Sequence, residues 1–247
     1  MTPPVVLAIA ASDSGGGAGL AADLATFAAL GVHGACVVTA VTAQDTTGVH
    51  SVHRVPLDQV AAQLDAVLGD LRVDVVKTGM LADAAVVRLV AERCAGLPIV
   101  VDPVLRATTG AVLADEGVVV AYREHLLPAA ALTAPNVHEA SALAPVPGAF
   151  VTTGSERGVD VLARPGHPDA TFTHAALVTE NDHGTGCTFS SAAAAYLAHG
   201  LTLPDAVDRA GRFVLRQLEQ SRTWSLGRGR GPIAHVIPTH PTTRGAR

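Results

Sequence analysis

The stretch VVLAIAASDSGGGAGLAADLATFAAL, residues 5–30, decides the fold class. Its first part, Val5–Ala10, is a short apolar run rich in β-branched residues, which predicts a buried strand. Its last part, Leu20–Leu30, carries apolar residues at helical spacing, and the loop between the two is rich in Ser and Gly. The stretch therefore predicts a strand, a tight loop and a helix, which is the repeating unit of an α/β fold.

The same alternation continues through the first half of the chain. Further runs predict strands at Cys36–Val41, Val73–Thr78 and Ile99–Val101, and helices at Leu57–Leu68 and Asp83–Cys94. Alternation of this kind predicts one domain with a central, mostly parallel sheet and helices on both of its faces. Ligands of such sheets bind at the carboxyl ends of the strands, so the loops there are the first place to search for a site.

The second half of the chain is less regular. We expect helices at Glu116–Leu126, at Cys187–His199 and from Pro204 to about Ser221, and short strands at Ala131–Thr133, Ala149–Thr152 and Val159–Leu162. The domain is expected to span residues 1–232, and residues 233–247 are expected to form a flexible tail.

Composition narrows the classes of protein to consider. The chain has 247 residues, 49% of them hydrophobic, and a formal net charge of −5, which gives no general attraction to nucleic acid or anionic lipid. No stretch approaches the roughly 20 apolar residues that span a bilayer. Three cysteines without a C-x-x-C pair predict neither a disulfide framework nor a zinc site. Because Val5–Ala11 lacks the basic flank of a signal peptide, we expect a cytoplasmic protein without nucleic-acid or membrane partners.

The sharpest motif is NDHGTGCT, residues 181–188, which stands immediately before a long helical pattern. Its small residues let successive backbone N–H groups turn toward one point, where the start of the helix adds partial positive charge, so the motif predicts an anion hole. The same field would stabilise a thiolate on the first turn, which makes Cys187 a candidate base or nucleophile. A glycine-containing helix start with a small buried thiol explains the same residues equally well.

A second loop of small residues, SDSGGGAG at residues 12–19, links the first strand to the first helix. Nucleotide and sugar-like ligands are commonly held at this place in α/β sheets. The loop is not a Walker A sequence, because no Gly-Lys-Ser/Thr follows, and it does not fit G-x-G-x-x-G. Taken alone, it is better explained as a flexible tight turn.

Polar residues follow several of the predicted strands. Gln44 follows the second strand, Asp102 follows Ile99–Val101, and Asn136 and Glu139 follow Ala131–Thr133. Carboxylate and amide oxygens that meet at strand ends can hold Mg²⁺ and its phosphates. Asn136 and Glu139 also have the spacing of a helix capping box, which is the safer interpretation of that pair from spacing alone.

Six motifs follow one another along the chain: AASDSGGGAG at 10–19 with ADL at 22–24, TAVTAQ at 39–44, KTGML at 77–81, DPV at 102–104, PNVHE at 135–139 and HGTGCT at 183–188. In this order they resemble the hydroxymethylpyrimidine and phosphomethylpyrimidine kinases, a branch of the ribokinase-like fold that also includes pyridoxal kinases. The closing GRGRGP at 227–232 is similar to the glycine-rich end of that family. The resemblance covers residues 1 to about 140 and resumes from Gly158 to about Pro232, and six ordered matches are far more specific than any one of them.

The resemblance implies a ribokinase-like domain that uses ATP and Mg²⁺ in thiamine biosynthesis. Its substrate would be 4-amino-5-hydroxymethyl-2-methylpyrimidine, phosphorylated on the hydroxymethyl group by direct in-line transfer, and then the monophosphate of that compound. Cys187 would be the base, and Gly184, Thr185 and Gly186 would donate N–H groups to the transferring phosphoryl group.

The resemblance also implies which residues bind the two substrates. For the pyrimidine they are Gln44 at the ring edge, Met80 and Val104 against the ring, and Gly17, Ala18 and Asp23 around the pocket. For the nucleotide they are Asp102, Asn136 and Glu139, with Asp102 and Glu139 arranging Mg²⁺, directly or through water. A homodimer is the assembly that the resemblance favours, and no interface can be named from the residues alone.

Two departures from the family pattern concern the nucleotide. The family has a helix and then a strand that ends in Lys-Gly-Gly-His, whereas here PVP at 145–147 follows Leu143 almost at once, so a helix is absent near residues 144–149. At the position of the phosphate-contacting lysine the chain has Thr152 or Thr153, which cannot neutralise phosphate charge. LRATTG at 105–110 replaces the usual Met-Val-Ala-Lys-Ser-Gly, and the hypothesis is that Arg106 restores a positive charge near the phosphates.

Two other interpretations stay open. A pyridoxal or pyridoxine kinase shares the fold, the anion hole and in some members the cysteine, although Gln44 and Met80 favour the pyrimidine. The missing helix and lysine are also compatible with a non-catalytic pyrimidine-binding protein, against which the complete motif at 184–188 argues. The sequence does not decide between one phosphorylation and two.

Overall fold

The strand β1, Val5–Ala10, lies inside an eight-stranded sheet with the order β10-β9-β8-β7-β6-β5-β1-β2. The structure, a computed structural model, describes residues 2–107, 110–153 and 158–236. The other strands of this sheet are β2 His33–Val38, β5 Val75–Thr78, β6 Ile99–Val101, β7 Leu132–Thr133, β8 Phe150–Thr152, β9 Val159–Arg164 and β10 His167–Thr173. The pairs from β2 to β8 are parallel, and β9 and β10 are antiparallel additions at one edge. The predicted α/β class with a mostly parallel sheet is confirmed.

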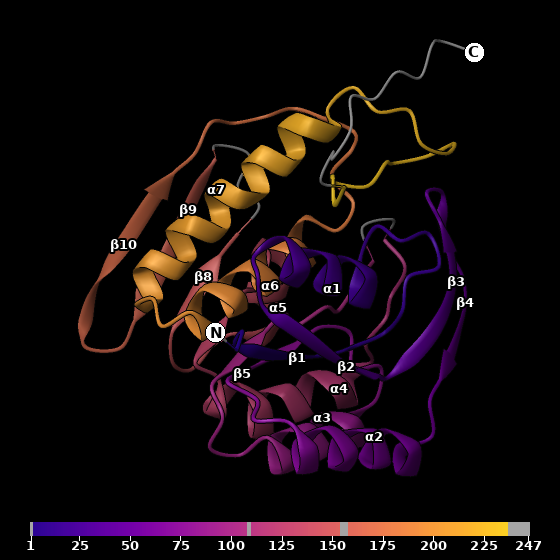
Figure 1. Cartoon of the computed structure of the whole chain (residues 1–247), viewed down its shortest axis with the longest axis vertical. Helices are drawn as coiled ribbons and strands as arrows, with labels where there is room; N and C mark the ends of the chain where they lie inside the picture. Colours follow the sequence, from indigo (N-terminus) through magenta and orange to yellow (C-terminus); the bar gives the residue numbers. More distant parts are fainter. Residues whose placement is uncertain (1, 108–109, 154–157, 237–247) are drawn as a thin grey trace.

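Helices cover both faces of this sheet (Figure 1). One face carries α1 Gly19–Ala29, α6 Thr185–Ala198 and α7 Leu203–Ser221, and the other carries α2 Leu57–Asp70, α3 Ala84–Arg93 and α4 Glu116–Ala121. Alternate residues of β1 belong to two separate hydrophobic cores. Val6 and Ala8 pack with α1, α6 and α7, whereas Leu7 and Ile9 pack with α2, α3 and α4. This alternation explains why the strands are apolar throughout, because both faces are buried.

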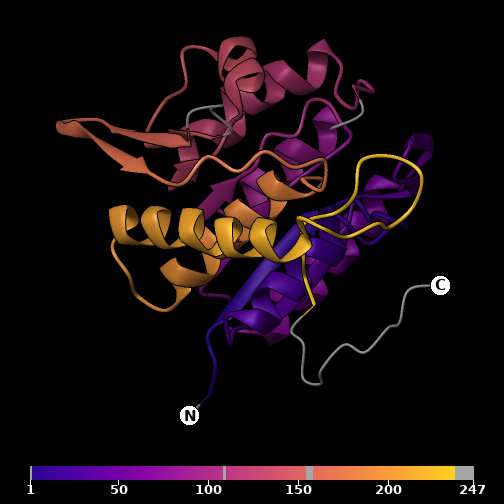
Figure 2. The same cartoon turned by 90° about the horizontal axis from the view of Figure 1, so that it is seen from above.

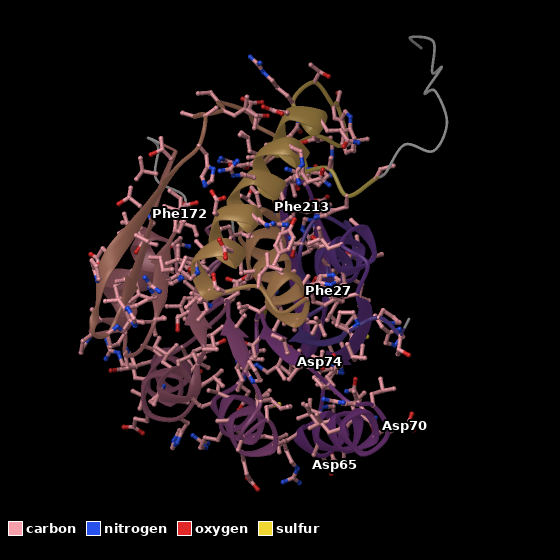
Figure 3. The ribbon with its side chains drawn as sticks, turned by 60° about the vertical axis from the view of Figure 1, so that its left-hand side comes forward. Phe27, Asp65, Asp70, Asp74, Phe172 and Phe213 are labelled. Carbon is pink, nitrogen blue, oxygen red and sulfur yellow. The ribbon has the colours of Figure 1, made fainter. Side chains whose placement is uncertain are left out.

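The side chains show the same division into two layers. Figure 3 places Phe27 of α1 and Phe213 of α7 on one side of the sheet, and Asp65 and Asp70 of α2 on the other. The alanines Ala192–Ala195 of α6 are fully buried. Their small side chains let α6 pack closely against both the sheet and α7.

The predicted strand Cys36–Val41 is wrong in its second half. β2 ends at Val38, and a separate strand, β3 Ala40–Asp45, pairs antiparallel with β4 Gly48–Arg54. Thr39 marks the change, because its N–H donates to Ala10 O of the main sheet while its carbonyl oxygen accepts from Val55 N, just after β4. An unbroken apolar run contains no signal for this change of partner. The β3–β4 hairpin projects from the body of the molecule (Figure 1).

Three differences concern the second half. The predicted helix Glu116–Leu126 consists of α4 followed by a π-helical turn, Tyr122–Leu126, and a 3-10 turn, Leu127–Ala129, comes directly after it. The edge strand β10 was absent from the prediction, because Pro168 interrupts its pattern and its register shifts between His167 and Ala170. The short helix α5, Val137–Leu143, leads into β8 through residues 144–149, which contain no helix.

The segment after α7 returns to the site. Figure 2 shows this yellow segment looping toward the β3–β4 hairpin, far from the hairpin of β9 and β10. Ile233 and Ala234 are buried in the core, so the packed part of the chain extends beyond Pro232, where we expected the tail to begin. Residues 237–247 lie outside the described residues. Within the described part of the chain, none of the helices has the length and apolar character needed to cross a membrane.

Candidate active site

The motif at 181–188 leads into α6 at the carboxyl edge of the sheet. Gly184 precedes the helix with a φ of +89°, which favours glycine. A Cβ at Gly184 would lie 1.8 Å from the carbonyl oxygen of Gly17, and a Cβ at Gly17 would lie 2.6 Å from Cδ2 of His183. The two glycine loops found in the sequence therefore pack directly against each other, and both contact points require glycine.

The first turn of α6 supplies the backbone donors of the expected anion hole. The first N–H groups of a helix have no partner inside it, and here they belong to Thr185, Gly186 and Cys187. Thr185 N–H donates to the carbonyl oxygen of Asp182 at 3.2 Å, and no side chain caps the helix. Gly186 and Cys187 are therefore the donors best placed to bind an anion, with Gly184 forming the turn beneath them.

Cys187 lies half-buried between α1 and the buried charges of the sheet. Burial raises the pKa of the thiol; the ammonium of Lys77 opposes this shift, and the carboxylates of Asp102 and Asp23 add to it. The backbone N–H of Gly19, at the start of α1, acts to lower the pKa of the thiol. The net direction is opposite to the one expected from the helix start, because desolvation outweighs the helix field.

A cluster of buried charges lies beneath Cys187. Lys77 Nζ and Asp23 Oδ1 are 2.7 Å apart, and both side chains are completely buried. Ser191 Oγ also donates to Asp23 Oδ1 at 2.7 Å. Asp102 Oδ2 lies 3.8 Å from the same ammonium and accepts from Ser190 Oγ at 3.2 Å. The resemblance implies a place for Asp23 around the ring pocket, but in the structure its carboxylate supports the site from below.

Lys77 is the functional residue that the sequence reasoning missed. Burial lowers its pKa, but the carboxylates of Asp23 and Asp102 and the Cys187 sulfur raise it overall, so the ammonium stays charged. The sequence does contain a sign of its role, since a lysine within the apolar run Val73–Thr78 is a buried charge that requires a partner. The identity of that partner was not available, because Asp23 is 54 residues away.

Asn136 and Glu139 form the capping box that their spacing indicates. Asn136 Oδ1 accepts from the N–H groups of His138 and Glu139, each at 3.0 Å, and Glu139 Oε2 accepts from Asn136 N at 3.0 Å. Glu139 Oε1 accepts from Leu105 N at 3.2 Å, in the loop after β6. Burial and the nearby carboxylate of Asp102 raise the pKa of Glu139 to about 7. The cap thus holds Glu139 close to Asp102.

These two carboxylates fit a magnesium ion better than they fit a transition metal. No group of three or more His, Cys, Asp or Glu side chains suited to a metal occurs in the described ranges. Mg²⁺ does not need such a cage, because it keeps several waters and is held by one or two carboxylates together with substrate phosphates. The repulsion between Asp102 and Glu139 that raises the pKa of Glu139 is the kind that a bound cation relieves.

The residues implied for the pyrimidine lie in two groups. Met80 and Val104 belong to one small apolar cluster with Ala11, Ala40 and Ala82. Gln44 lies at the end of β3, and its side-chain amide is 3.0 Å from Nε2 of His183. The structure thus brings Met80 and Val104 together, as the resemblance implies, and adds His183 as a neighbour of Gln44.

The loop at residues 12–19 is organised by Asp13. Its carboxylate accepts from the N–H groups of Gly15, Gly17 and Ala18, at 2.8, 3.2 and 2.8 Å. Nε2 of His183 lies 2.9 Å from Oδ2 of the same carboxylate. Gly17 and Ala18 therefore shape the site with their backbone, whose N–H groups are already bonded within the protein. Asp13 was absent from the predicted site residues.

Two regions depart from the family pattern. Thr153, which with Thr152 is a candidate for the lysine position, forms a parallel bridge with Asn136. Arg106 is exposed and forms an antiparallel bridge with Val112. The residues that follow Thr153, 154–157, lie outside the described part of the chain.

The closing segment completes the edge of the site. Arg230 pairs with Asp182, and Arg228 Nη2 donates to Asp45 Oδ2 at 3.2 Å. His183 N–H donates to Gly231 O at 3.0 Å. His235 Nε2 lies 2.9 Å from Oγ1 of Thr188, and burial, reinforced by His183, lowers the pKa of His235 to about 4. The contact of His235 lies within residues 233–247, which were expected to form a tail.

Two surface hollows lie elsewhere on the described residues. One is lined by Asp74, Pro98, Ala131 and Leu203, at the opposite end of the sheet. The other lies beside Arg54 and Asp83, between β4 and α3. Neither hollow is lined by the glycine loops or by Cys187. The candidate active site is therefore placed at the sheet edge beside α6, where the motifs meet.

Comparison with known proteins identifies one family over nearly the whole chain. A sequence profile of the family described as phosphomethylpyrimidine kinase matches residues 13–152 and 146–234. The hydroxymethylpyrimidine/phosphomethylpyrimidine kinase of Synechococcus elongatus is 40% identical over 264 residues, which cover 96% of this chain and 99% of that protein. The protein of the same name from Mycobacterium bovis is 41% identical and covers 96% of this chain and 95% of its own.

A longer relative contains a similar sequence as one part. The thiamine biosynthesis bifunctional protein ThiED of Geobacter sulfurreducens is 42% identical over 260 residues, which cover 94% of this chain. The chain spans 52% of the length of that protein.

Solved structures agree on the fold. The ADP complex of Bacillus subtilis pyridoxal kinase superimposes with a TM-score of 0.85 at 31% identity, covering 95% of this chain and 98% of that one. Phosphomethylpyrimidine kinase from Clostridium difficile gives a TM-score of 0.75 at 28% identity, covering 86% of this chain and 98% of that one.

Proposed function

Since this chain belongs to the phosphomethylpyrimidine kinase family and is a kinase of thiamine biosynthesis, we propose that it transfers the γ-phosphoryl group of ATP to 4-amino-5-hydroxymethyl-2-methylpyrimidine. The monophosphate of this compound is proposed as the second acceptor. The contact between Gly17 and Gly184 carries the proposal. It joins the loop assigned to the pyrimidine to the helix start assigned to the phosphoryl group, as direct transfer between two substrates requires.

In the proposed reaction the hydroxymethyl oxygen forms a bond to the γ-phosphorus while the bond from that phosphorus to the β–γ bridging oxygen breaks. The thiolate form of Cys187 takes the hydroxyl proton on Sγ and becomes the thiol. The N–H groups of Gly186 and Cys187, with the turn at Gly184 and Thr185, hold the charge on the phosphoryl oxygens. Burial raises the pKa of Cys187, so the ammonium of Lys77 is the group that makes a thiolate accessible.

The pyrimidine is proposed to bind between β3 and the loops after β5 and β6. Met80 and Val104 supply an apolar surface for one face of the ring. Gln44 supplies an amide that both donates and accepts, which suits the edge of an aminopyrimidine. The backbone of Gly17 and Ala18 closes the pocket, and the absence of a side chain at Gly17 keeps His183 in place.

The nucleotide is proposed to bind beside Asp102, Asn136 and Glu139. Mg²⁺ at Asp102 and Glu139, directly or through water, would neutralise charge on the phosphates. Asn136 positions Glu139 through the capping box. Arg106 is exposed in the loop after β6 and is proposed to replace the missing lysine. An unchanged Michaelis constant for ATP in the Arg106→Ala protein would remove Arg106 from this role.

The deciding experiment is ATP-dependent phosphorylation of the hydroxymethylpyrimidine, with the products resolved by mass. Pyridoxal is assayed beside it, and Cys187→Ala beside the wild-type protein. We expect turnover of the pyrimidine to one and then two phosphates, and a fall in kcat of roughly 10²–10⁴-fold in the variant. Binding of the pyrimidine without any product would instead indicate a protein that has lost phosphoryl transfer.

Pyridoxal phosphorylation is the second candidate function. It is favoured by the higher TM-score of the B. subtilis pyridoxal kinase, 0.85 against 0.75 for the C. difficile phosphomethylpyrimidine kinase. Turnover of pyridoxal alone would assign this function, and a preference for the pyrimidine in kcat/KM would reject it as the main activity.

A homodimer and a cytoplasmic location are proposed as well. The hairpin of β3 and β4 exposes apolar side chains, with Val41 51% and Val52 39% exposed, and a second copy would cover them. Light scattering of the wild-type protein and of Val41→Lys tests the dimer.

The location is supported by three free cysteines, which suit a reducing compartment. Fractionation of the native cells tests it.

A further inference from the structure

Gln44 is held at three points by the two glycine loops. Its backbone N–H donates to Ser14 Oγ at 2.8 Å, and the same hydroxyl donates to its carbonyl oxygen at 2.7 Å. The nitrogen Nε2 of its side-chain amide is placed 3.0 Å from Nε2 of His183. The register of β3 against β4 shifts between Ala43 and Gln44, and such an irregularity redirects a side chain. The position of the amide is thus fixed, whereas the assignment of its oxygen and NH₂ ends, which have nearly the same shape, must follow from the hydrogen bonds around it.

Asp13 determines whether Nε2 of His183, the ring nitrogen beside Gln44, carries a hydrogen. Nε2 of His183 lies 2.9 Å from Asp13 Oδ2, so this one nitrogen faces both the carboxylate and the amide. Burial raises the pKa of Asp13, but hydrogen bonds from His183, Gly15 and Ala18 lower it overall. The carboxylate is therefore ionised at neutral pH.

An ionised carboxylate only accepts hydrogen bonds, so Nε2 of His183 must carry a hydrogen toward Asp13. This holds for the neutral ring with its hydrogen on Nε2 and equally for the imidazolium ion. Nε2 then has no lone pair to offer to Gln44. An NH₂ group against it would place two donors face to face in a half-buried site, and an unsatisfied polar group there is costly. The stable arrangement is therefore the reversed amide, with the oxygen of Gln44 toward His183 and the NH₂ group away from it.

We propose that His183, held by Asp13, turns the amide of Gln44 so that its NH₂ group faces the substrate ring, which makes His183 a positioning residue that determines specificity. The inference rests on the function proposed above. The ring nitrogen beside the amino-bearing carbon of the pyrimidine accepts this hydrogen bond. In the 4-oxo analogue, where a carbonyl replaces the amino group, the same nitrogen carries a hydrogen and meets the NH₂ group as a second donor.

The test measures kcat and KM for the aminopyrimidine and its 4-oxo analogue at saturating ATP. In Gln44→Glu, an acceptor replaces the NH₂ group, and we expect KM for the aminopyrimidine to rise about 10- to 100-fold while kcat changes little. In His183→Ala, the amide is free to turn over, and we expect the preference in kcat/KM for the aminopyrimidine over the oxo analogue to fall at least about tenfold. His167→Ala is the matched control, since His167 is exposed on the edge strand β10, and it should keep the wild-type preference.

Two outcomes would overturn the proposal. A Gln44→Glu protein with the wild-type KM would mean that the amide oxygen faces the substrate. An unchanged preference in a folded His183→Ala protein would mean that His183 does not orient Gln44. The comparison of two substrates within one variant separates this effect from a general loss of active protein.

A second measurement does not depend on turnover. Nitrogen-15 NMR of ring-labelled histidine, with the His183 signals identified by their loss in His183→Ala, reports whether Nε2 carries a hydrogen at neutral pH. We expect a protonated Nε2, and an unprotonated Nε2 would overturn the orientation of Gln44. A wild-type protein that does not phosphorylate the pyrimidine would overturn the proposed function, and the state of Nε2 would still decide the inference about Gln44.

Discussion

Replacement of Lys77 by methionine tests the buried charges beneath Cys187. The ammonium lies 2.7 Å from Asp23 and 3.8 Å from Asp102, and the side chain of Lys77 is completely buried. Methionine fills most of the same space without a charge, so the change leaves two buried carboxylates without their countercharge. Removing one partner from a buried ion pair costs about 3–5 kcal/mol. In a chain of this size, each kcal/mol lowers Tm by roughly 2–4 °C, so we expect a fall of about 6–20 °C.

Urea unfolding followed by circular dichroism measures the free energy of unfolding, and calorimetry measures Tm. Arg93→Met is the matched control, because it removes the ion pair of Arg93 with Asp65, which is 2.9 Å long but lies at the surface. A surface pair contributes about 0–1 kcal/mol, so the control should stay close to the wild-type protein.

The loss of stability in Lys77→Met must also depend on pH. Burial already raises the pKa values of Asp23 and Asp102, and Lys77 opposes the shift in both. A carboxyl group whose pKa is higher in the folded protein contributes stability below its unfolded pKa, and this contribution is lost as the pH rises through the folded pKa. The deficit should therefore be smaller at pH 5 than at pH 8. A variant within about 1 kcal/mol of the wild-type protein at pH 8, or with equal deficits at both pH values, would refute the reasoning.

Three further outcomes are expected. Gly184→Ala should lower kcat/KM at least about 100-fold, because its Cβ would lie 1.8 Å from Gly17 O. Gly200 has a similar φ of +84° but open space around it, so Gly200→Ala should keep its activity in the same kinetic assay. The pKa of Glu139 is about 7 in the folded protein against a usual 4.5. As the pH rises from 5 to 8, the wild-type protein should therefore lose roughly 1–3 kcal/mol of stability relative to Glu139→Gln. Urea unfolding measures this, and the same pH dependence in both proteins would contradict it. Iodoacetamide should modify Cys187 at least about tenfold more slowly than free cysteine at pH 8, measured by mass spectrometry of the peptide, and an equal rate would contradict a raised pKa of the thiol.

Hydrophobic pattern alone predicted the centre of the fold, because the central strands are buried on both faces. The predicted bounds of Val5–Ala10 and Ile99–Val101 are those of β1 and β6. The pattern failed where the chain changes its partner, at Thr39, since a hydrophobic run does not encode which strand lies beside it. It also failed at β10, an edge strand whose exposed residues and Pro168 weaken the alternation.

The candidate site was predictable to the extent that motifs mark it. The motif at 181–188 and the loop at 12–19 contain most of the residues that meet at α6. The motifs do not reveal which of their side chains contact one another. Asp13 and His183 are 170 residues apart, and Asp23 and Lys77 are 54 apart, so no local spacing connects them. The fold supplies these pairings, because β1, β5 and α6 end or begin at one edge of the sheet.

The buried charges bear on how a nucleotide can bind at this edge. Asp23 and Asp102 are buried beside one buried ammonium, that of Lys77, and the buried carboxyl group of Glu139 lies near Asp102. ATP phosphates would add further negative charge, and a threonine stands where the family pattern has a lysine. The first turn of α6 contributes only about half a positive charge. A divalent cation at Asp102 and Glu139 brings two charges and removes the repulsion between these carboxylates. In the proposed site, positive charge for the transferring phosphoryl group would therefore come from the helix start and a cation, with the exposed Arg106 as the further source proposed above.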